Sequence, residues 1–534
     1  MKRLFFFICA LVLLCCPSSF AAVEWDGTSA PWTKGTGTET DPYLIETPQH
    51  LSYLSEMVSA GINTYKDKYF KQTQDFDMKS LVFTPIGTKY FFRGNYDGNN
   101  KSISNLNISG DNDNNDIALF GAVSGHIICN VIVDGNFTST VSGRKYAAGI
   151  VAYGLGINLH NCRNNAKIDV SSEYAAGIMA YCAGACVITS CSNTGEIHSN
   201  RYTGGIVGVV GVFNANTIMT CTLTDCANMG TMYSSYISGG MVGCNYGDTC
   251  IVERCSNAGV VYSSATYQNS YSGGLIGYNY DKKIYRLNNC SNVGAVYSTV
   301  VSLTNDDAYA GGIVGYNSSK YNKLTNCYAH CIVEAKVSIG GNQEKQEYAY
   351  GITDGDTIRN SYFAGTLSGG HKYGIARNGS HTIITNCYFN SDCGASTSSR
   401  YDYGTAKTTA QLKSLSMPIL LNGSETGTIW VMDTNNSNDG YPIFGWQAAP
   451  TYKITATCDD SQGSVSGGGN YSEGTIVTLT ATHKEGYIFS GWSDGDKTNP
   501  RSVTVGTADA TYTALFVKMR YVITVNQDCS VNVQ

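Results

Sequence analysis

The stretch YSGGLIGYNYDKKIYRLNNCSNVGAVYS, residues 271–298, decides the fold because the chain repeats it. Residues 309–335 read YAGGIVGYNSSKYNKLTNCYAHCIVEA, with the same order of a glycine-rich apolar phrase, a polar break and an Asn-Cys phrase. The apolar runs are short, rich in Ile, Val and Tyr, and bounded by Gly, Asn and Ser, which is typical of strands. A repeat of roughly 23 to 39 residues predicts a solenoid, a propeller or another array.

The number of strands in each unit separates these architectures. A propeller blade needs four antiparallel strands in about 40 to 45 residues, whereas each unit here offers two or three short strands and loops of variable length. We therefore predict an all-β fold in which each unit is one coil of a parallel β-helix. Coils stacked at the strand spacing of about 4.8 Å would align equivalent residues into columns.

The repeated phrases suggest roles for their residues. We expect Gly204 and Gly205 to allow a tight bend or a close backbone approach, with Ile206 and Val207 in the core. The Asn that follows each Cys should lie at a turn, where Asn tolerates left-handed geometry. These residues are Asn193, Asn228, Asn257 and Asn292.

Seven cysteines occupy one repeated position, and Ser361 takes their place in another copy. They are Cys162, Cys191, Cys226, Cys255, Cys290, Cys327 and Cys387. An exported protein normally forms disulfides, yet in-register stacking would align these side chains instead of pointing them at one another. We predict a column of buried thiols that are mostly reduced.

The open ends of a solenoid must be covered. In ETPQHLSYLSEMVSAG, Thr47 is a helix N-cap, Pro48 suits the first helical position, and Gly61 ends the helix. This helix is the expected N-terminal cap. A second short helix is expected from Thr408 in TTAQLKSLSMPILLN, before NDGYPIFGW closes the array near residue 446.

The N-terminus and the composition bear on location and partners. Residues 1–22 contain Lys2 and Arg3, an apolar run and a small-residue site, which predict a signal peptide. A lipid anchor on Cys15 or Cys16 is the alternative, although Leu14 stands where a small residue is wanted. No later apolar run reaches the length of a membrane span. A net charge of -6 without a basic run argues against nucleic acid as a partner. We expect a secreted or cell-surface protein.

The sequence holds few candidates for chemistry. A β-helix enzyme that degrades polysaccharides could use the acid pairs Asp306-Asp307 or Asp354 and Asp356, accompanied by basic side chains. These are His330, Arg359 and His371. Both acid pairs lie in Gly- and Asn-rich segments, where solvated turns are the simpler interpretation, and we predict no catalytic residue.

Metal sites have equally weak signals. Carboxylates at Asp111, Asp113 and Asp116 could hold calcium, and three close cysteine pairs could suggest zinc. These pairs are Cys182 with Cys186, Cys244 with Cys250, and Cys327 with Cys331. A polar turn explains the first group, and buried thiols or a local disulfide explain the pairs because no His partners accompany them. We predict no metal and no cofactor.

One set of residues is a candidate binding surface. A tyrosine stands three residues before the key glycine in most copies and should form one aromatic column. The column comprises Tyr146, Tyr174, Tyr202, Tyr271, Tyr309 and Tyr348. If exposed, it could pack against sugar rings or a partner protein; if buried, it is a structural ladder.

Two resemblances follow from these motifs. The phrase Gly-Gly-Ile-Val-Gly-Tyr-Asn resembles the GLUG repeat, and flanks such as NDGYPIFGW are similar to those found beside it in secreted bacterial surface proteins, over about residues 36–446. This resemblance implies a right-handed β-helix and an adhesin-like role, with no catalytic residues. Residues 451–517, with GYIFSGWSDG and YTALF, resemble the divergent internalin-type B repeat.

The predicted organisation places a signal peptide at 1–22, a leader and cap at 23–117, and the GLUG-like β-helix at 118–404. A closing segment at 405–446, a small β-rich domain at 451–517 and a partial repeat or tail at 518–534 follow. We expect an adhesin-like protein that binds glycans or protein partners through a lateral face and the loops 298–309 and 338–348. The alternatives are a β-helix enzyme acting on polysaccharides and a structural stalk.

Overall fold

The computed structural model describes residues 21–533, except for 62–64, 111–115, 212–217, 302–305, 320, 339–345, 378–381, 397–403, 424–428, 449–450, 521–522 and 526–530. The predicted signal peptide therefore lies almost wholly outside the described residues, as do Asp111, Asp113 and the centres of both variable loops. The chain divides into two compact units, residues 1–443 and 444–534. No helix in the described ranges is long and apolar enough to cross a membrane.

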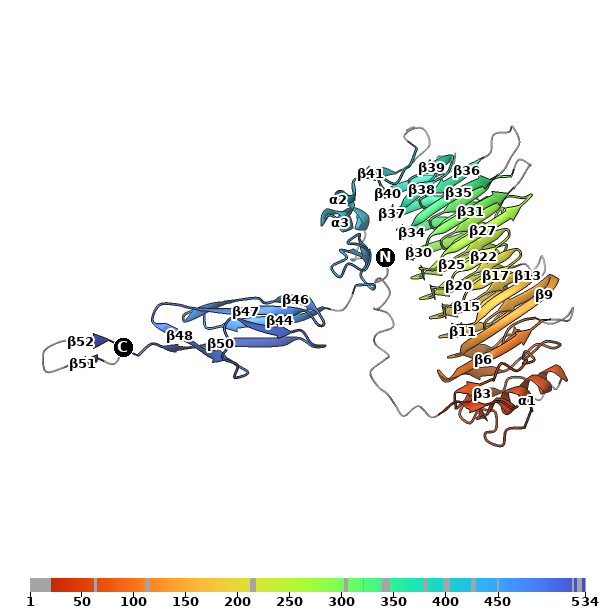
Figure 1. Cartoon of the computed structure of the whole chain (residues 1–534), viewed down its shortest axis with the longest axis horizontal. Coiled ribbons are helices and arrows are strands. Elements are labelled where there is room, and N and C mark those ends of the chain that lie inside the picture. The colour runs from red at the N-terminus through yellow and green to blue at the C-terminus, as the bar shows by residue number, and fades with distance from the viewer. Residues whose placement is uncertain are drawn as a thin grey trace. The chain divides into compact units, whose positions relative to one another are not determined.

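The first unit is a parallel β-helix, as predicted. Four sets of strands recur in each coil, and each strand pairs in parallel with its equivalent one coil away (Figure 1). The set that follows the glycine pair forms a sheet of seven strands: β7 (Phe120–Ser124), β10 (Val151–Leu155), β14 (Met179–Ala183), β19 (Val207–Val210), β24 (Val242–Asn245), β29 (Ile276–Asn279) and β33 (Val314–Asn317).

After the polar break comes the set that leads into the Asn-Cys phrase. It comprises β8 (Ile127–Cys129), β11 (Asn158–His160), β15 (Ala185–Thr189), β20 (Thr220–Thr224), β25 (Thr249–Glu253), β30 (Ile284–Asn292), β34 (Lys323–Ala329), β37 (Thr357–Phe363) and β40 (Ile383–Asn390). Short strands carry the Asn in four coils: β12 (Arg163–Asn164), β16 (Ser192–Asn193), β21 (Ala227–Asn228) and β26 (Ser256–Asn257).

Two further sets complete each coil. The third is β9 (Ile132–Ala148), β13 (Lys167–Ala176), β17 (Ile197–Ser199), β22 (Met232–Ser234), β27 (Val261–Thr266), β31 (Val296–Val301), β35 (Ile332–Ser338) and β38 (Thr366–Ser368). The fourth carries the tyrosine before the glycine pair, at the ends of β9 and β13 and in β18 (Tyr202–Gly204), β23 (Ile237–Gly239), β28 (Ser270–Gly273), β32 (Ala308–Gly311), β36 (Glu347–Tyr350) and β39 (His371–Tyr373).

The N-terminal end is covered by the predicted helix. Helix α1 (Pro48–Ser59) begins after Thr47, whose side chain accepts a hydrogen bond from the His50 backbone N–H. Leu51, Leu54 and Val58 join the core of the stack, and Figure 1 shows α1 at the end where the chain enters. The leader strands are β1 (Val23–Glu24), β2 (Tyr43–Ile45), β3 (Tyr69–Gln72), β4 (Phe76–Asp77), β5 (Asn95–Asp97) and β6 (Ser102–Ser109).

A ladder of buried asparagine side chains runs through the interior. The Nδ2 of Asn164 donates to Oδ1 of Asn193 at 2.8 Å, and the series continues through Asn228 and Asn257 to Asn292 at 2.7 to 2.8 Å. Each amide also donates to a carbonyl two residues further on, as Asn228 does to Gly230 at 3.0 Å. These polar groups are thus fully paired where water is excluded.

The glycine pair makes room for this ladder. A Cβ on Gly205 would lie 2.4 Å from Cγ of Asn228 and 2.1 Å from the Gly240 carbonyl oxygen. Gly177, Gly240 and Gly274 meet Asn193, Asn257 and Asn292 in the same way. The predicted close approach is confirmed, and it joins the glycine phrase to the Asn phrase of the same coil.

The left-handed backbone does not occur at the asparagines where the sequence predicted it. The asparagines two residues after each Cys face inward and form the ladder, and the left-handed backbone occurs immediately before each Cys. Asn161, Ser190, Asp225 and Arg254 have φ values of 48° to 54° there. A single left-handed residue turns the chain at this corner. Asn holds this position in most coils, as in Asn289, Asn326 and Asn386, which fits its tolerance of this geometry, while Ser190, Asp225 and Arg254 show that the stack also holds other residues there.

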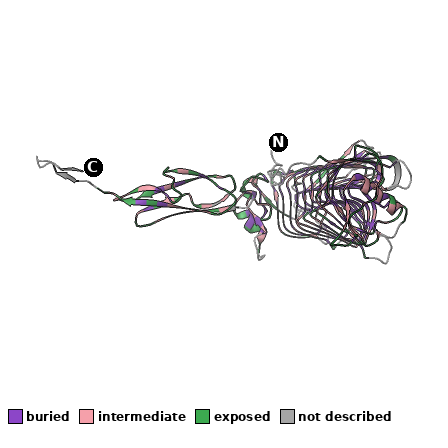
Figure 2. Cartoon of the chain, turned by 90° about the horizontal axis from the view of Figure 1, so that it is seen from below, coloured by how far each residue is buried: buried purple, intermediate pink, exposed green. Residues whose placement is uncertain are grey.

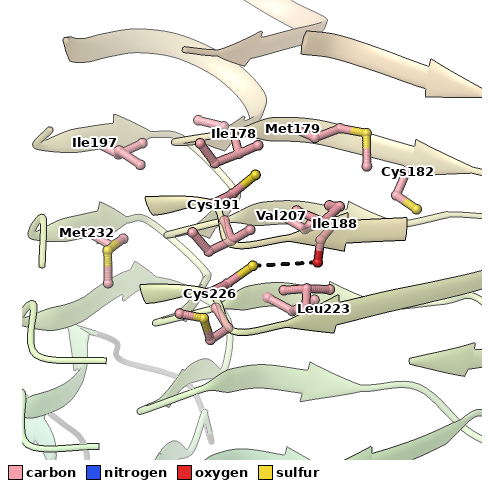
Figure 3. Packing of buried hydrophobic residues seen from close by; sticks show 14 of the residues in the cluster. Ile178, Met179, Cys182, Ile188, Cys191, Ile197, Val207, Leu223, Cys226 and Met232 are labelled. Carbon is pink, nitrogen blue, oxygen red and sulfur yellow. Dashed lines mark hydrogen bonds between the residues drawn. The ribbon is translucent and has the colours of Figure 1, made fainter. Parts of the chain in front are cut away.

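The seven repeated cysteines form the predicted column of buried, free thiols. Each thiol faces backbone carbonyls; Cys226 Sγ donates to the Ile188 oxygen at 3.6 Å, among Ile178, Val207 and Leu223 (Figure 3). Ser361 fits the series because its Oγ accepts from the Cys327 N–H at 3.0 Å, as Cys191 Sγ does from the Cys162 N–H at 3.3 Å. Figure 2 colours the buried residues purple, and they recur along the strands of the stacked coils.

The closing segment differs from its prediction in one respect. The expected single helix is split into α2 (Thr409–Leu412), with Thr408 and Gln411 as a capping box, and α3 (Ser416–Asn422). Pro418 explains the split, because a continuous helix would place its ring against the carbonyl four residues earlier. Strand β41 (Thr405–Lys407) pairs with β40, and β42 (Trp430–Val431) pairs with β43 (Ile443–Phe444).

The second unit is a small β domain. Its strands are β44 (Thr451–Cys458), β45 (Gly463–Ser466), β46 (Gly469–Ser472), β47 (Ile476–His483), β48 (Tyr487–Trp492), β49 (Arg501–Thr504) and β50 (Ala510–Lys518), followed by a β51 (Ile523–Val525) and β52 (Val531–Val533) pair. Val477, Leu479 and Ala481 alternate into its core beside Trp492 and Phe516, as the strand-period pattern predicts.

The asparagine ladder generates the first prediction. Asn228→Ala should lower the free energy of unfolding by about 2 to 4 kcal/mol, because it removes one of the two acceptors of the buried Asn193 amide and the donor to the buried Asn257 oxygen. Urea denaturation followed by circular dichroism measures this. Asn165→Ala is the control, since Asn165 is exposed, and should change the stability by less than about 0.5 kcal/mol. Equal effects of the two changes would contradict a structural role of the ladder.

A second prediction concerns the N-terminal cap. Deleting residues 36–61 removes β2 and α1 and exposes Phe70 and its neighbours at an unpaired strand edge, so the protein should aggregate. Size-exclusion chromatography with light scattering measures this, with a deletion of residues 518–534 as the control that should stay monomeric. A monomeric 36–61 deletion with unchanged melting behaviour would show that this segment is not the cap.

Candidate functional site

Two rows of tyrosines lie on the outer side of the β-helix, one on each side of the glycine pair. We call them together the tyrosine seam. The first row is the predicted column: Tyr146, Tyr174, Tyr202, Tyr271, Tyr309 and Tyr348. The second row, which was not predicted, consists of Tyr153, Tyr181, Tyr278 and Tyr316.

Strand alternation sets the direction of the first row, whereas in the second row the alternation is interrupted, since Ala180 and Tyr181 both belong to the outer cluster. Ala175 of β13 belongs to the interior core, whereas its neighbour Tyr174 belongs to a separate apolar cluster. In β14, Met179 and Cys182 point into the interior core, and Tyr181 packs against the outer cluster. The bend at the glycine pair brings the two outward rows together.

The rings of the seam pack both along a row and across it. In the first row, the Tyr174 and Tyr202 ring centroids are 5.3 Å apart and nearly parallel, and those of Tyr309 and Tyr348 are 4.9 Å apart. Across the rows, Tyr309 meets Tyr316 edge to face at 4.7 Å. These are the favoured geometries of aromatic pairs, so the seam is a second apolar layer outside the solenoid core.

The register of the first row is confirmed, with one interruption at Ile237, which takes the place of a tyrosine. Its rings are largely covered: Tyr174, Tyr202, Tyr271 and Tyr348 are only 4 to 8% exposed, and Tyr146 and Tyr309 are half-buried. These six residues therefore act first as a structural ladder. The surface that a ligand could touch belongs more to the half-buried second row.

The second row had a readable signal in the sequence. Tyr153, Tyr181, Tyr278 and Tyr316 each stand seven residues after a tyrosine of the first row. The two positions point to the same side only because the chain bends at the glycine pair between them. In the middle coils, Val209 and Cys244 occupy the positions of this row in place of tyrosine. There the hydroxyls of Tyr202 and Tyr246 form a hydrogen bond of 3.0 Å.

The seam is uncharged along most of its tyrosines. Burial raises the pKa of Tyr153 and Tyr278 to about 12, so these hydroxyls stay neutral and can donate or accept hydrogen bonds. Arg201 lies over the rings of Tyr202 and Tyr236 at 5.3 and 5.7 Å, and it is 3.7 Å from the carboxylate of Glu173. Neutral rings with scattered polar groups suit stacking on sugars or on a protein surface.

Charged groups gather at the C-terminal end of the seam. Asp354 Oδ1 lies 3.2 Å from Nε of Arg377, and the Asp354 side chain is only 2% exposed. The Arg377 guanidinium lies 5.6 Å from the Tyr348 ring, against which His371 stacks at 5.0 Å. Asp307 accepts a hydrogen bond from the Tyr309 hydroxyl at 2.9 Å. Of the predicted acidic and basic candidates, the structure brings Asp307, Asp354 and His371 to this end.

The other candidates lie elsewhere. Asp356 is fully buried inside the coil, where it accepts from Asn317 at 2.8 Å and from the Tyr285 hydroxyl, and burial holds its pKa well above the usual range. His330 contacts Asn438 of the closing segment at 2.9 Å. Arg359 is exposed on β37.

Of the three close cysteine pairs, Cys182 with Cys186 and Cys327 with Cys331 lie wholly in the interior core, and the third pair is divided. Cys244 belongs to the outer cluster, whereas Cys250 lies in the interior core. Cys331 accepts a hydrogen bond from the Asn292 amide at 3.2 Å. Within the parts of the chain that the structure describes, no three His, Cys, Asp or Glu side chains are placed to hold a metal ion.

Comparison with known proteins bears on the second unit. Residues 452–520 match the family model of the divergent InlB B-repeat domain. This match confirms the B-repeat-like unit expected at 451–517. No curated protein matches the chain.

One solved structure similar to the chain is that of a proposed immunoglobulin A1 protease from Bacteroides ovatus. The two share 16% identity with a TM-score of 0.36, over 78% of this chain and 96% of that one. A likeness at this level carries no argument about activity.

The Asp354 carboxyl generates a prediction about pH. Burial raises its pKa to about 6, from 3.8 in an exposed setting. The folded state then binds the proton more tightly than the unfolded state, so the stability is fully present below pH 4 and is lost as the pH rises through 6. The free energy of unfolding should fall by about 2 kcal/mol between pH 4 and 7 relative to Asp354→Asn. Parallel urea titrations measure the difference, and a constant difference would contradict a raised pKa.

Proposed function

We propose that the protein is a secreted or surface-exposed, adhesin-like binding protein whose β-helix is a GLUG-repeat array. The supporting observation is the tyrosine seam, two outer rows of rings carried by most of the successive coils. A solenoid fills its interior with side chains, so a partner can meet only its lateral faces and loops. The B-repeat unit at 452–520 is compatible with location at a surface.

Glycans are the partner class that the seam favours, with a protein surface as the second class. Half-buried rings in register offer flat apolar contact at low entropy cost, and their neutral hydroxyls supply hydrogen bonds. We propose a non-enzymatic role because the acidic candidates are engaged: Asp354 is buried against Arg377, and Asp356 lies inside the coil. The structural stalk remains the alternative to binding.

The test changes the second row of the seam. Tyr278→Ala with Tyr316→Ala should leave the fold intact and weaken glycan or cell binding about tenfold, since two half-buried stacking platforms are lost. A glycan array and cell-binding assays measure this on the mature chain. The control is Tyr262→Ala with Tyr297→Ala, which removes two half-buried rings from the strands β27 and β31.

Two outcomes would contradict this proposal. If both double variants bind like the original protein, the seam is not the contact surface. If residues 23–446 bind no glycan, protein or cell, the β-helix is a stalk that carries the C-terminal unit. Tyr271→Ala is not a suitable probe of binding, because removal of a buried ring costs about 3 to 5 kcal/mol.

A further inference from the structure

At the C-terminal end of the tyrosine seam, the side chain of Arg377 is fixed in place by a carboxylate and a tyrosine ring. Arg377 contacts Asp354 through Nε at 3.2 Å and through Nη2 at 3.5 Å, and its guanidinium lies over the Tyr348 ring. A buried carboxylate on one side and a ring below hold the guanidinium in one orientation. Its side chain is nevertheless 41% exposed, so part of this fork reaches the surface.

The position of Asp354 explains this arrangement. The backbone N–H groups of Ile313 and Val314 both donate to the Ile352 carbonyl, so the segment around residue 353 stacks on β33 in the next coil. Thr353 in turn forms a parallel bridge with Ala376, one coil further on. Asp354 and Arg377 thus occupy equivalent positions in two neighbouring coils. In the preceding coils the residue after Val314 or Ile276 is glycine, Gly315 or Gly277, at the tight bend between the two tyrosine rows. A carboxylate at this place is covered by the rings, and the arginine of the next coil lies beside it.

The N–H donors of the Arg377 guanidinium are only partly used at this end, since Asp354 contacts Nε and Nη2. Asp307 already accepts from the Tyr309 hydroxyl, and Asp354 already pairs with Arg377. In the described part of the chain, no other acceptor contacts the Arg377 guanidinium, which has five N–H donors in a planar fork. A planar carboxylate is the group that such a fork binds bidentately.

We propose that Arg377 forms a subsite for the carboxylate of an acidic sugar whose chain lies along the tyrosine seam. This inference rests on the proposed glycan binding and adds the class of glycan. The half-buried ring of Tyr316 contacts a sugar unit, and Arg377, held over the covered ring of Tyr348, selects a unit that carries a carboxylate. Asp354 orients Arg377 and at the same time competes with the ligand for it.

The experiment must separate loss of Arg377 from loss of folding. Arg377→Gln alone would leave the Asp354 carboxylate buried without its cation, which is strongly destabilising. The informative pair is therefore Asp354→Asn and the double change Asp354→Asn with Arg377→Gln, which differ only in the arginine. Arg359→Gln, placed in the Asp354→Asn background, is the control because Arg359 is exposed on β37, and Arg201→Gln tests the other arginine of the seam.

The probes are oligosaccharides of galacturonate, glucuronate-containing oligosaccharides and sialyllactose, each beside its methyl ester, which has the same skeleton without the charge. Isothermal titration calorimetry gives the affinities. We expect at least one acid to bind more tightly than its ester, and Asp354→Asn to bind that acid severalfold more tightly still. The double change should weaken binding of the acid about tenfold relative to Asp354→Asn and leave the ester within twofold.

Each other outcome overturns a defined part of the inference. If acids and esters bind equally, or if the preference for the acid survives the double change, Arg377 is not the subsite. If the preference disappears with Arg201→Gln instead, the subsite is misplaced. If the Tyr278 and Tyr316 double variant retains all binding while the Arg377 change removes it, the acidic sugar does not lie along the seam. If no probe binds, the carboxylate subsite fails, and the glycan array decides separately whether the proposed glycan binding stands.

Discussion

The buried asparagine ladder is the interaction on which the β-helix depends. Each amide between Asn164 and Asn292 donates to the next coil and to its own backbone, so its groups are paired only when neighbouring coils are in register. A shift by one residue would bury several amides without partners, at a large cost in free energy. The ladder also requires a glycine opposite each amide, as Gly205 is opposite Asn228. The glycine phrase and the Asn-Cys phrase therefore depend on each other, because each buried amide needs a glycine beside it.

The same register has a consequence on the outside. Because equivalent residues lie above one another, any outward residue that repeats becomes a row, and the bend at the glycine pair brings two such rows together as the tyrosine seam. The first row is covered by the second and stabilises the bend. Function, where it uses this surface, is left to the half-buried second row and to the few positions that break the pattern. Asp354 and Arg377 are such positions, in the coils where the glycine phrase degrades.

At the end of the asparagine ladder, the last amide pairs with a different kind of side chain. Asn292 donates to Cys331 Sγ because Ala329 stands where the next asparagine would be. A second ladder through Asn245, Asn279 and Asn317 ends at Asp356, which also accepts from Tyr285. Interior polar groups are thus paired to the end of each ladder. The acidic residues that first suggested catalysis serve this role in one case, Asp356, and support an arginine in the other, Asp354.

The sequence by itself determined the repeat, the parallel stacking, the cap helix α1 and the column of cysteines, because periodic residues in a solenoid have equivalent neighbours and Thr47 and Pro48 are local signals. It also indicated the row of Tyr146 to Tyr348. Only the tertiary structure decided that this row is covered, that Tyr278 and Tyr316 lie beside it, and that Asp354 meets Arg377. It likewise decided that Asn228 faces inward while Asp225 takes the left-handed corner. The reason is physical: inward or outward direction depends on where the chain bends, and the bend is set by contacts between coils that no single repeat contains.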